Sequence, residues 1–318
     1  MDVIWKDNNI LYNVLCFLIT ENEKLFDKSD KFLYWRTVLH MATITLYCYL
    51  GFWASSIEDS MRTHPDIIIQ TANKYKVGLL TGWNIMFQSL FVALALVYDL
   101  LEWADRHDSN FGKKLKYYRD VLFCSVVTPL TLFVTCMFWS VYAVDRTLVF
   151  PVVFDDVVPW WFNHCVHTNI SIVVLLESIL TARRHPTDPK LERKICAAIC
   201  IAYAVVYYSI YLISHRWLYD VFGKMTWWQI CLFQGVIFFS FFIFYVIQFP
   251  INRLFHRADD EKSAKMEVES LKSDDQTNGV VAIDGHTKAP GNETFLDQSW
   301  SLKHRNYPRD IISEKTKL

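Results

Sequence analysis

The sequence predicts an all-α membrane protein, a six-transmembrane-helix bundle with a disordered cytoplasmic C-terminal tail. Three observations favour this class. Six apolar blocks are each long enough to cross a bilayer. Lys and Arg are concentrated in every second connection between these blocks. The chain becomes polar after about Arg257. The composition agrees, since 53% of the 318 residues are hydrophobic and only 20% are charged. These proportions exclude a disordered chain and a small secreted disulfide-rich protein.

Each predicted helix follows from the length of an apolar block. A bilayer core of about 30 Å requires about 20 apolar residues in a helix. In chain order the six blocks are Phe32–Ala54, Val77–Leu100, Val121–Val144, Val157–Leu180, Ile195–Ile213 and Met225–Phe249. An earlier apolar piece, Asn9–Thr20, is too short to span and is expected to lie in the interface as an amphipathic lead-in. The predicted divisions are a cytoplasmic or interfacial segment 1–31, a membrane domain 32–255 and a tail 258–318.

The basic residues predict which side of the bundle is cytoplasmic, because cytoplasmic connections carry an excess of Lys and Arg. One side holds Lys6, Lys24, Lys28, Lys31, Arg106, Lys113, Lys114, Lys116, Arg119, Arg183, Arg184, Lys190, Arg193 and Lys194. The other side holds only Arg62, Lys74, Lys76, Arg146, Arg216 and Lys224. Both termini are therefore expected in the cytoplasm. An even number of spans also puts Arg253 and Arg257 on the basic side.

The cysteines and the net charge exclude several classes of partner. All eight cysteines lie inside apolar runs and no Cys-x-x-Cys occurs, so free thiols are expected. Cys196 and Cys200, four residues apart, leave palmitoylation or a metal site as alternatives to simple burial. A net charge of -1 with dispersed basic residues argues against nucleic acid. Asn292-Glu293-Thr294 matches a glycosylation acceptor, but a cytoplasmic tail does not meet that machinery.

Polar residues inside the predicted spans are the functional candidates, because such groups are costly in hydrocarbon and face the bundle interior. On the second span the stripe is Thr81, Asn84, Gln88 and Asp99. On the fourth it is His164, His167, Thr168 and Ser171. Helical spacing places each set on one face, so the two faces are expected to meet. The alternative is interhelical hydrogen bonding that only holds the bundle together.

A threonine and a histidine at matching depth suggest catalysis. The two predicted spans enter from the non-cytoplasmic side near Lys76 and Pro159, and counted from those residues Thr81 lies about 7 Å and His167 about 12 Å along the helix. Histidine is suited to take the proton of a hydroxyl nucleophile near neutral pH. Other polar groups near that end could orient the base or bind a head group, and they are His215 and the pair Asp145 and Arg146. His40 enters from the cytoplasmic side and is interpreted as a packing residue, and Glu177 as the partner of Arg183 or Arg184.

Several motifs carry a family resemblance over roughly residues 33–255. They are Phe138-Trp139, Tyr142-Ala143, Asp145-Arg146, Pro151 and Trp161-Phe162-Asn163-His164-Cys165-Val166-His167-Thr168. They are supported by Leu80-Thr81, Arg119-Asp120, Pro129, Glu177 and Trp217-Leu218-Tyr219. Together these residues resemble the androgen-induced gene 1 family.

The resemblance implies a multipass membrane hydrolase that cleaves fatty acid esters of hydroxy fatty acids. It maps the nucleophile to Thr81 and the base to His167, needs no metal or cofactor, and leaves His164 as a structural or oxyanion-binding residue. Asn163, Asn84 and Gln88 are supporting candidates. The expected site lies toward the non-cytoplasmic leaflet, of the plasma membrane ahead of the endoplasmic reticulum. Gly82, where the family pattern has a bulkier residue, departs from it and affects the expected acyl-chain preference.

Three other functions fit parts of the sequence. A transporter or channel also has polar residues in its spans, although helices broken by Gly and Pro are common there and Pro129 is the one clear interior proline. A haem or metal protein could use His164, His167 and His215. A non-enzymatic membrane regulator would act by contact through its tail. The sequence leaves the oligomeric state open.

Overall fold

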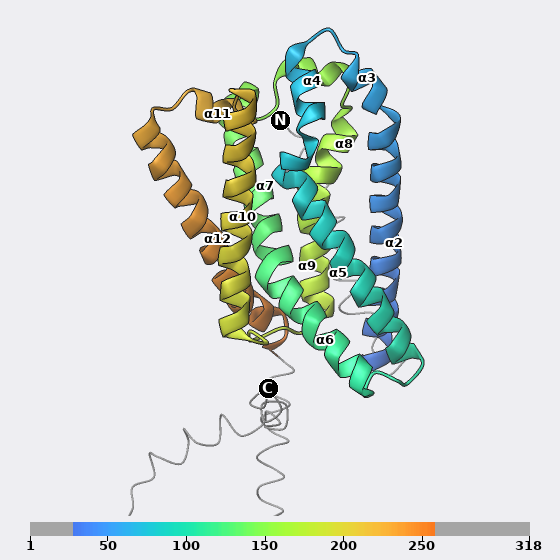
Figure 1. The fold of residues 1–318 in the computed structure, drawn as a ribbon. Helices are drawn as coiled ribbons and strands as arrows, with labels where there is room; N and C mark the ends of the chain where they lie inside the picture. The colour runs from blue at the N-terminus through green and yellow to red at the C-terminus, as the bar shows by residue number, and fades with distance from the viewer. Residues whose placement is uncertain (1–27, 258–318) are drawn as a thin grey trace, which may run out of the picture. The chain divides into compact units, whose positions relative to one another are not determined.

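The computed structural model describes residues 28–257, which are mainly helical and contain no strand (Figure 1). Five long apolar helical stretches in this range could each cross a membrane. They are α2 (Lys28–Ser56), α5 (Leu80–Trp103), the continuous run of α6 (Asn110–Leu122), η2 (Phe123–Val127) and α7 (Thr128–Asp145), α10 (Pro189–Ser214), and α12 (Trp227–Phe255). The predicted all-helical membrane class is confirmed. The interfacial segment Asn9–Thr20, Cys16, the motif at Asn292 and the tail lie outside the described residues.

The predicted fourth span differs from the others. Its residues form α8 (Trp160–His164), a π-helical turn η5 (Cys165–Asn169) and α9 (Ile170–Leu180), none of which is long enough to cross a bilayer alone. Figure 1 shows α8 and α9 following one another along the bundle beside α5 and α7. Five stretches are therefore long and apolar enough to cross a membrane, and the predicted fourth span, which carries the polar residues Asn163, His164, His167 and Asn169, is not among them.

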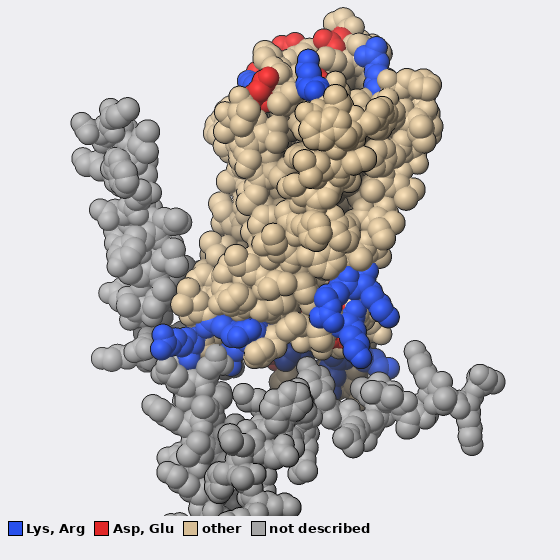
Figure 2. Space-filling view, turned by 90° about the vertical axis from the view of Figure 1, so that its left-hand side faces the viewer, with Lys and Arg blue, Asp and Glu red and all other residues tan. Residues whose placement is uncertain are grey.

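The two ends of the bundle differ in charge. One end, called the basic end, holds the connections 104–109 and 181–188. The other end, called the loop end, holds six short helical elements of the described residues. They are α3 (Glu58–Arg62), α4 (Ile67–Lys74), η1 (Lys76–Gly78), η3 (Arg146–Leu148), η4 (Val152–Asp156) and α11 (Asp220–Gly223). Figure 2 shows Lys and Arg at the lower, basic end, both signs of charge at the upper end, and an uncharged belt between them. Such a belt matches the apolar interior of a bilayer.

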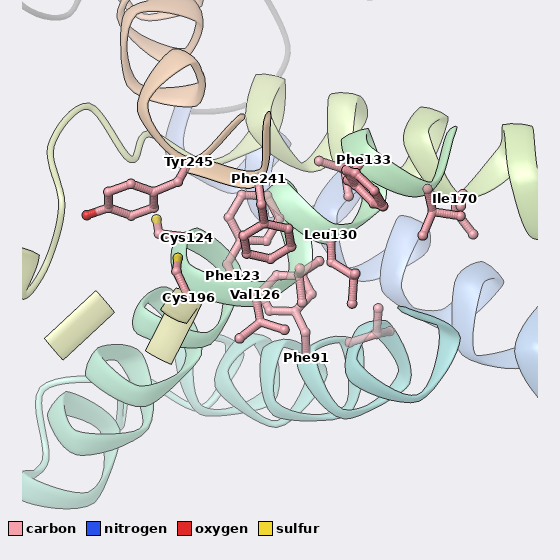
Figure 3. Close-up of a cluster of buried hydrophobic side chains, with 14 of the residues drawn as sticks. Phe91, Phe123, Cys124, Val126, Leu130, Phe133, Ile170, Cys196, Phe241 and Tyr245 are labelled. Atoms are coloured by element: carbon pink, nitrogen blue, oxygen red, sulfur yellow. The ribbon is translucent and has the colours of Figure 1, made fainter. Parts of the chain in front are cut away.

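Aromatic and branched apolar side chains from five elements fill the interior (Figure 3). Phe91 of α5, Phe123 of η2, Leu130 of α7, Ile170 of α9 and Phe241 of α12 are all buried there. Other large apolar side chains point outward, as expected for a lipid-facing surface, and examples are Phe52, Val144, Ile213 and Phe239. Because lipid is as apolar as these side chains, close packing and polar contacts hold the helices together.

The π turn η2 is explained by a proline two residues after it. Pro129 has no N–H to donate to the carbonyl of Ser125, and the turn leaves backbone acceptors free. The thiol of Cys196 donates to the Ser125 carbonyl, with Sγ and O 2.9 Å apart, and the amide of Gln248 donates to the Cys124 carbonyl at 2.8 Å. Cys196 is thus a buried, hydrogen-bonded thiol, and the seven described cysteines are free, as predicted.

A buried ionic network joins the helices near the basic end. It begins at Arg36 of α2, which pairs with Glu102 and, at 2.6 Å, with Asp99 of α5. Asp99 also contacts His40 Nδ1 at 2.6 Å, and His40 Nε2 lies 3.1 Å from Glu177 of α9. The interpretation of His40 as a packing residue is therefore wrong, because both of its ring nitrogens contact carboxylates.

The network continues from Glu177 into the connection after α9. Arg183 Nη2 donates to Glu177 at 2.7 Å, which confirms the predicted pairing, and Arg183 Nε donates to Asp120 at 2.9 Å. Arg119, the last member of the network, donates from Nη2 to Asp120 Oδ1 at 2.8 Å. Three arginines and four carboxylates take part, so a protonated His40 donating to both neighbours makes the network electrically neutral.

Candidate active site

Thr81 lies at the start of α5, near the loop end. Leu79 precedes the helix in an extended conformation, with φ -73° and ψ 123°, and provides no side-chain cap. The free N–H of Leu80 instead donates to the hydroxyl of Tyr219, with N and Oη 3.1 Å apart. Thr81 is therefore held in the first turn, where the helix dipole is positive and favours a developing oxyanion on a hydroxyl.

His167 lies in the π turn η5, opposite Thr81. The Thr81 Oγ1 atom is 3.1 Å from His167 Nε2, and His167 Nδ1 is 3.1 Å from the backbone carbonyl of Asn163. A carbonyl oxygen only accepts hydrogen bonds, so Nδ1 carries the proton and Nε2 accepts from the Thr81 hydroxyl. This arrangement is that of a hydroxyl nucleophile with a neutral histidine base.

Packing fixes the plane of the His167 ring. The ring stacks on Phe138 of α7, with centroids 3.6 Å apart and planes 12° apart. Only 9% of the His167 surface is exposed, and Asn163, one turn earlier in the chain, is also buried. π-helical turns occur often at functional sites, and here the turn carries the histidine that contacts Thr81.

The predicted polar stripe of α5 divides between two sites. Asn84 and Gln88 are buried near Thr81, where Gln88 Nε2 donates to Thr131 Oγ1 at 2.6 Å and Thr131 Oγ1 donates to Asn84 Oδ1 at 2.9 Å. Asp99 lies far along the same helix in the ionic network. The faces of the second and fourth predicted spans do meet, through Thr81 and His167 and through Gln88, whose Nε2 lies 3.4 Å from the Ile170 carbonyl.

His164 lies outside this contact. It is exposed, its Nδ1 is 3.3 Å from Thr168 Oγ1, and its ring stacks on Trp139 with centroids 5.0 Å apart. The Trp139 indole donates to the same hydroxyl at 3.1 Å. These contacts hold the His164 ring against Trp139 and Thr168, and none of them connects His164 to Thr81.

Asp145, Arg146 and His215 have other partners. Asp145 caps η3 by accepting from the Thr147 N–H at 2.9 Å, and Arg146 pairs with Asp155 at 2.8 Å. His215 ends α10 in a left-handed conformation, with φ 54°. None of the contacts among residues 28–257 joins these side chains to His167, whose orienting partner is the Asn163 carbonyl.

A metal site built from His164, His167 and His215 does not form in the described part of the chain. No group of three or more His, Cys, Asp or Glu side chains in residues 28–257 is arranged to hold a metal ion. Both ring nitrogens of His167 already have protein partners. The fit of a metal to these three histidines is therefore poor.

Comparison with known proteins gives the family. The family model described as FAR-17a/AIG1-like protein matches residues 35–253, well over half of the chain. The chain belongs to the FAR-17a/AIG1-like family. This membership confirms the resemblance found from the motifs and agrees with a multi-pass membrane protein.

Several known proteins are moderately similar to this chain. The human androgen-dependent TFPI-regulating protein is 29% identical over 192 residues, which cover 59% of this chain and 79% of that protein. Its mouse counterpart is 31% identical over 193 residues, with the same coverage of 59% and 79%. The human androgen-induced gene 1 protein is 26% identical over 187 residues, covering 57% and 75%. No solved structure matches the chain.

Gly82 leaves open space beside Thr81. A Cβ atom built at Gly82 would meet only the Lys76 carbonyl oxygen, at 3.8 Å. For the esterase that the family resemblance implies, we expect Gly82→Leu to fold normally and to lower kcat/KM for long-chain acyl esters about 10-fold or more relative to short-chain esters. The measurement is hydrolysis of a chain-length series by membranes with matched protein levels. Equal loss for short and long chains would contradict this role.

Tyr219 anchors the turn that holds Thr81. In the sequence, Tyr219 is marked only as part of the family motif Trp217-Leu218-Tyr219, which does not indicate this contact. Tyr219→Phe removes the acceptor for the Leu80 N–H. Because leaving this partly buried donor without a partner costs free energy, we expect a lower melting temperature and slower turnover. Thermal unfolding in detergent and hydrolysis rates would measure both. Tyr211→Phe, in the same aromatic cluster against Trp217, is the control, and equal effects of the two variants would contradict the anchoring role.

Proposed function

We propose that this protein is an intramembrane lipid esterase that hydrolyses fatty acid esters of hydroxy fatty acids. The observation that carries the proposal is the 3.1 Å contact between Thr81 Oγ1 and His167 Nε2, with Nδ1 held by the Asn163 carbonyl. Its support is this geometry within an apolar helical bundle, together with the family resemblance to such hydrolases. Thr81 is the proposed nucleophile and His167 the proposed base.

The first half of the reaction transfers the acyl group to Thr81. Thr81 Oγ1 bonds to the ester carbonyl carbon while its proton passes to His167 Nε2. The tetrahedral intermediate then collapses, the bond between carbon and the ester oxygen breaks, and His167 gives its proton to the departing alkoxide oxygen, which becomes the hydroxyl of the hydroxy fatty acid. The products of this half are a free hydroxy fatty acid and acyl-Thr81.

The second half restores the enzyme. A water molecule attacks the acyl-Thr81 carbonyl while His167 Nε2 takes one of its protons. The bond between the carbonyl carbon and Thr81 Oγ1 breaks, and His167 returns the proton to Thr81. The fatty acid leaves, so one ester and one water have become one hydroxy acid and one fatty acid.

The proposal includes the placement of the protein in the membrane. The α8–η5–α9 segment is the remaining crossing, which gives six spans with both termini in the cytoplasm. The concentration of Lys and Arg at the basic end supports this orientation. The site then opens toward the non-cytoplasmic leaflet, of the plasma membrane ahead of the endoplasmic reticulum. The bilayer and its lipid esters are the proposed partners.

The deciding experiment compares wild type, Thr81→Ala and Thr81→Ser at matched expression in membranes. The substrate is a branched fatty acid ester of a hydroxy fatty acid, and released fatty acid is measured by mass spectrometry. We expect hydrolysis by wild type, none by Thr81→Ala and partial activity in Thr81→Ser, which keeps the hydroxyl. Inactive wild type, or full turnover by Thr81→Ala, overturns the proposal.

A regulatory role is the second candidate, because two of the relatives are named for regulating TFPI. A regulator of that kind would act by contact with another protein. It predicts that Thr81→Ala keeps every cellular effect of the wild type, whereas an esterase predicts their loss.

A further inference from the structure

One buried amide beside Thr81 has an unused donor. Asn84 is completely buried, and its Oδ1 accepts from Thr131, but Nδ2 has no hydrogen-bond partner among residues 28–257. A buried donor without a partner costs about 1–3 kcal/mol, and such groups are rare in folded proteins. The mechanism above does not use this atom, so the Nδ2–H remains available to donate to a substrate atom.

A chain of hydrogen bonds fixes the direction of the Asn84 amide. The Ile170 carbonyl can only accept, so Gln88 presents Nε2 to it, at 3.4 Å, and Oε1 to the hydroxyl of Tyr47. Gln88 Nε2 also donates to Thr131 Oγ1 at 2.6 Å. The Thr131 hydroxyl donates to Asn84 Oδ1 at 2.9 Å, and this contact turns Nδ2 away from Thr131.

The same helix places Asn84 next to the nucleophile. Asn84 follows Thr81 by three residues, about 4.5 Å along the axis of α5 and on the same face. Side chains in an α-helix lean toward its N-terminus, so the Asn84 amide lies over the turn that carries Thr81. Thr81 contacts His167 and Gln88 contacts Ile170, so Asn84 lies between the two points where α5 meets the fourth predicted span.

We propose that Asn84 Nδ2 is an oxyanion donor for the reaction at Thr81, an inference that rests on the proposed esterase function. When Thr81 Oγ1 bonds to the ester carbon, the π electrons of the carbonyl move onto its oxygen, which becomes negatively charged. The Nδ2–H donates a hydrogen bond to that oxygen without transferring its proton. The same donor serves the attack of water on acyl-Thr81. The proposal replaces His164, the oxyanion-binding candidate from the sequence, with Asn84, because His164 is exposed and contacts Thr168.

The test uses the full-length protein in membranes with two substrates, a long-chain ester and its thionoester, in which sulfur replaces the carbonyl oxygen. Sulfur accepts hydrogen bonds weakly, so an oxyanion donor makes wild type strongly prefer the ester. We expect Asn84→Ala to lower kcat for the ester by about 10² to 10³, with little change in KM, and to reduce the preference for the ester. Asn84→Asp, which keeps the acceptor and loses the donor, should behave alike.

The control is Ser89→Ala on the same helix, whose hydroxyl donates to the Ile85 carbonyl at 2.7 Å, and it should keep the wild-type kcat and preference. Active wild type together with unchanged kcat in both Asn84 variants overturns the oxyanion role and leaves the esterase proposal standing. Equal losses on both substrates also overturn it, since they indicate structural damage. If neither variant folds, turnover of ester and thionoester at equal rates by wild type still overturns the proposal, because it excludes any oxyanion donor. Inactive wild type marks the failure of the esterase proposal itself.

Discussion

His167→Ala is expected to reduce hydrolysis of the fatty acid ester by about 10² to 10⁴, the usual contribution of a positioned general base. Without the imidazole, the Thr81 hydroxyl loses its only acceptor among the described contacts, and the departing hydroxyl loses its proton donor. KM should change little, because His167 bonds to Thr81 rather than to the bulk of the substrate. Turnover measured at saturating substrate in membranes with matched expression gives the answer.

His164→Ala is the matched comparison, because this second histidine lies one turn away and its ring is exposed. It should keep most of the wild-type turnover. Losses of similar size in the two variants would mean that the histidines act together, or that damage to the π turn inactivates the enzyme. The assignment of His167 as sole base would then be wrong.

Arg183→Met is expected to destabilise the bundle by about 3–5 kcal/mol, because it leaves Glu177 and Asp120 buried without their shared partner. Burial acts to lower the pKa of Arg183, but the two carboxylates outweigh it and raise the pKa above its ordinary value. The guanidinium is therefore charged in the folded protein, and its removal leaves an uncompensated negative charge. Thermal unfolding of the detergent-purified protein measures the loss.

Lys190→Met provides the control, since it removes an exposed positive charge from the same end of the bundle. It should unfold at nearly the wild-type temperature. Any Arg183→Met protein that remains folded should keep its kcat, because the ionic network and Thr81 lie at opposite ends of α5. Equal melting temperatures for the two variants would show that the network contributes little to stability.

The fold and the central contact could be predicted because they depend on regular helices. Apolar length located the helices, and helical spacing placed Thr81 and His167 on facing sides at compatible depths. The pairing of Glu177 with Arg183 followed from the need of a buried carboxylate for a nearby cation. Each of these arguments uses only the period of the helix and the cost of polar groups in hydrocarbon.

The remaining features depend on irregular backbone and on tertiary contact. Nothing in the apolar pattern marks Cys165–Asn169 as a π turn, so the sequence predicts a regular α-helix through this segment. The partner that orients His167 is a main-chain carbonyl, and side-chain types give no information about it. His40 was misread because its two carboxylate partners come from helices 59 and 137 residues away.

The ionic network also gives the bundle uneven mechanical strength. At the basic end, charged contacts tie α2, α5, α6 and the end of α9 to one another, and separating them would expose buried charge to hydrocarbon. At the loop end, α5 meets η5 through the neutral pair of Thr81 and His167. The ion pairs described at the loop end are exposed, so separating the helices there breaks no buried ion pair and should cost less free energy than separating them at the basic end.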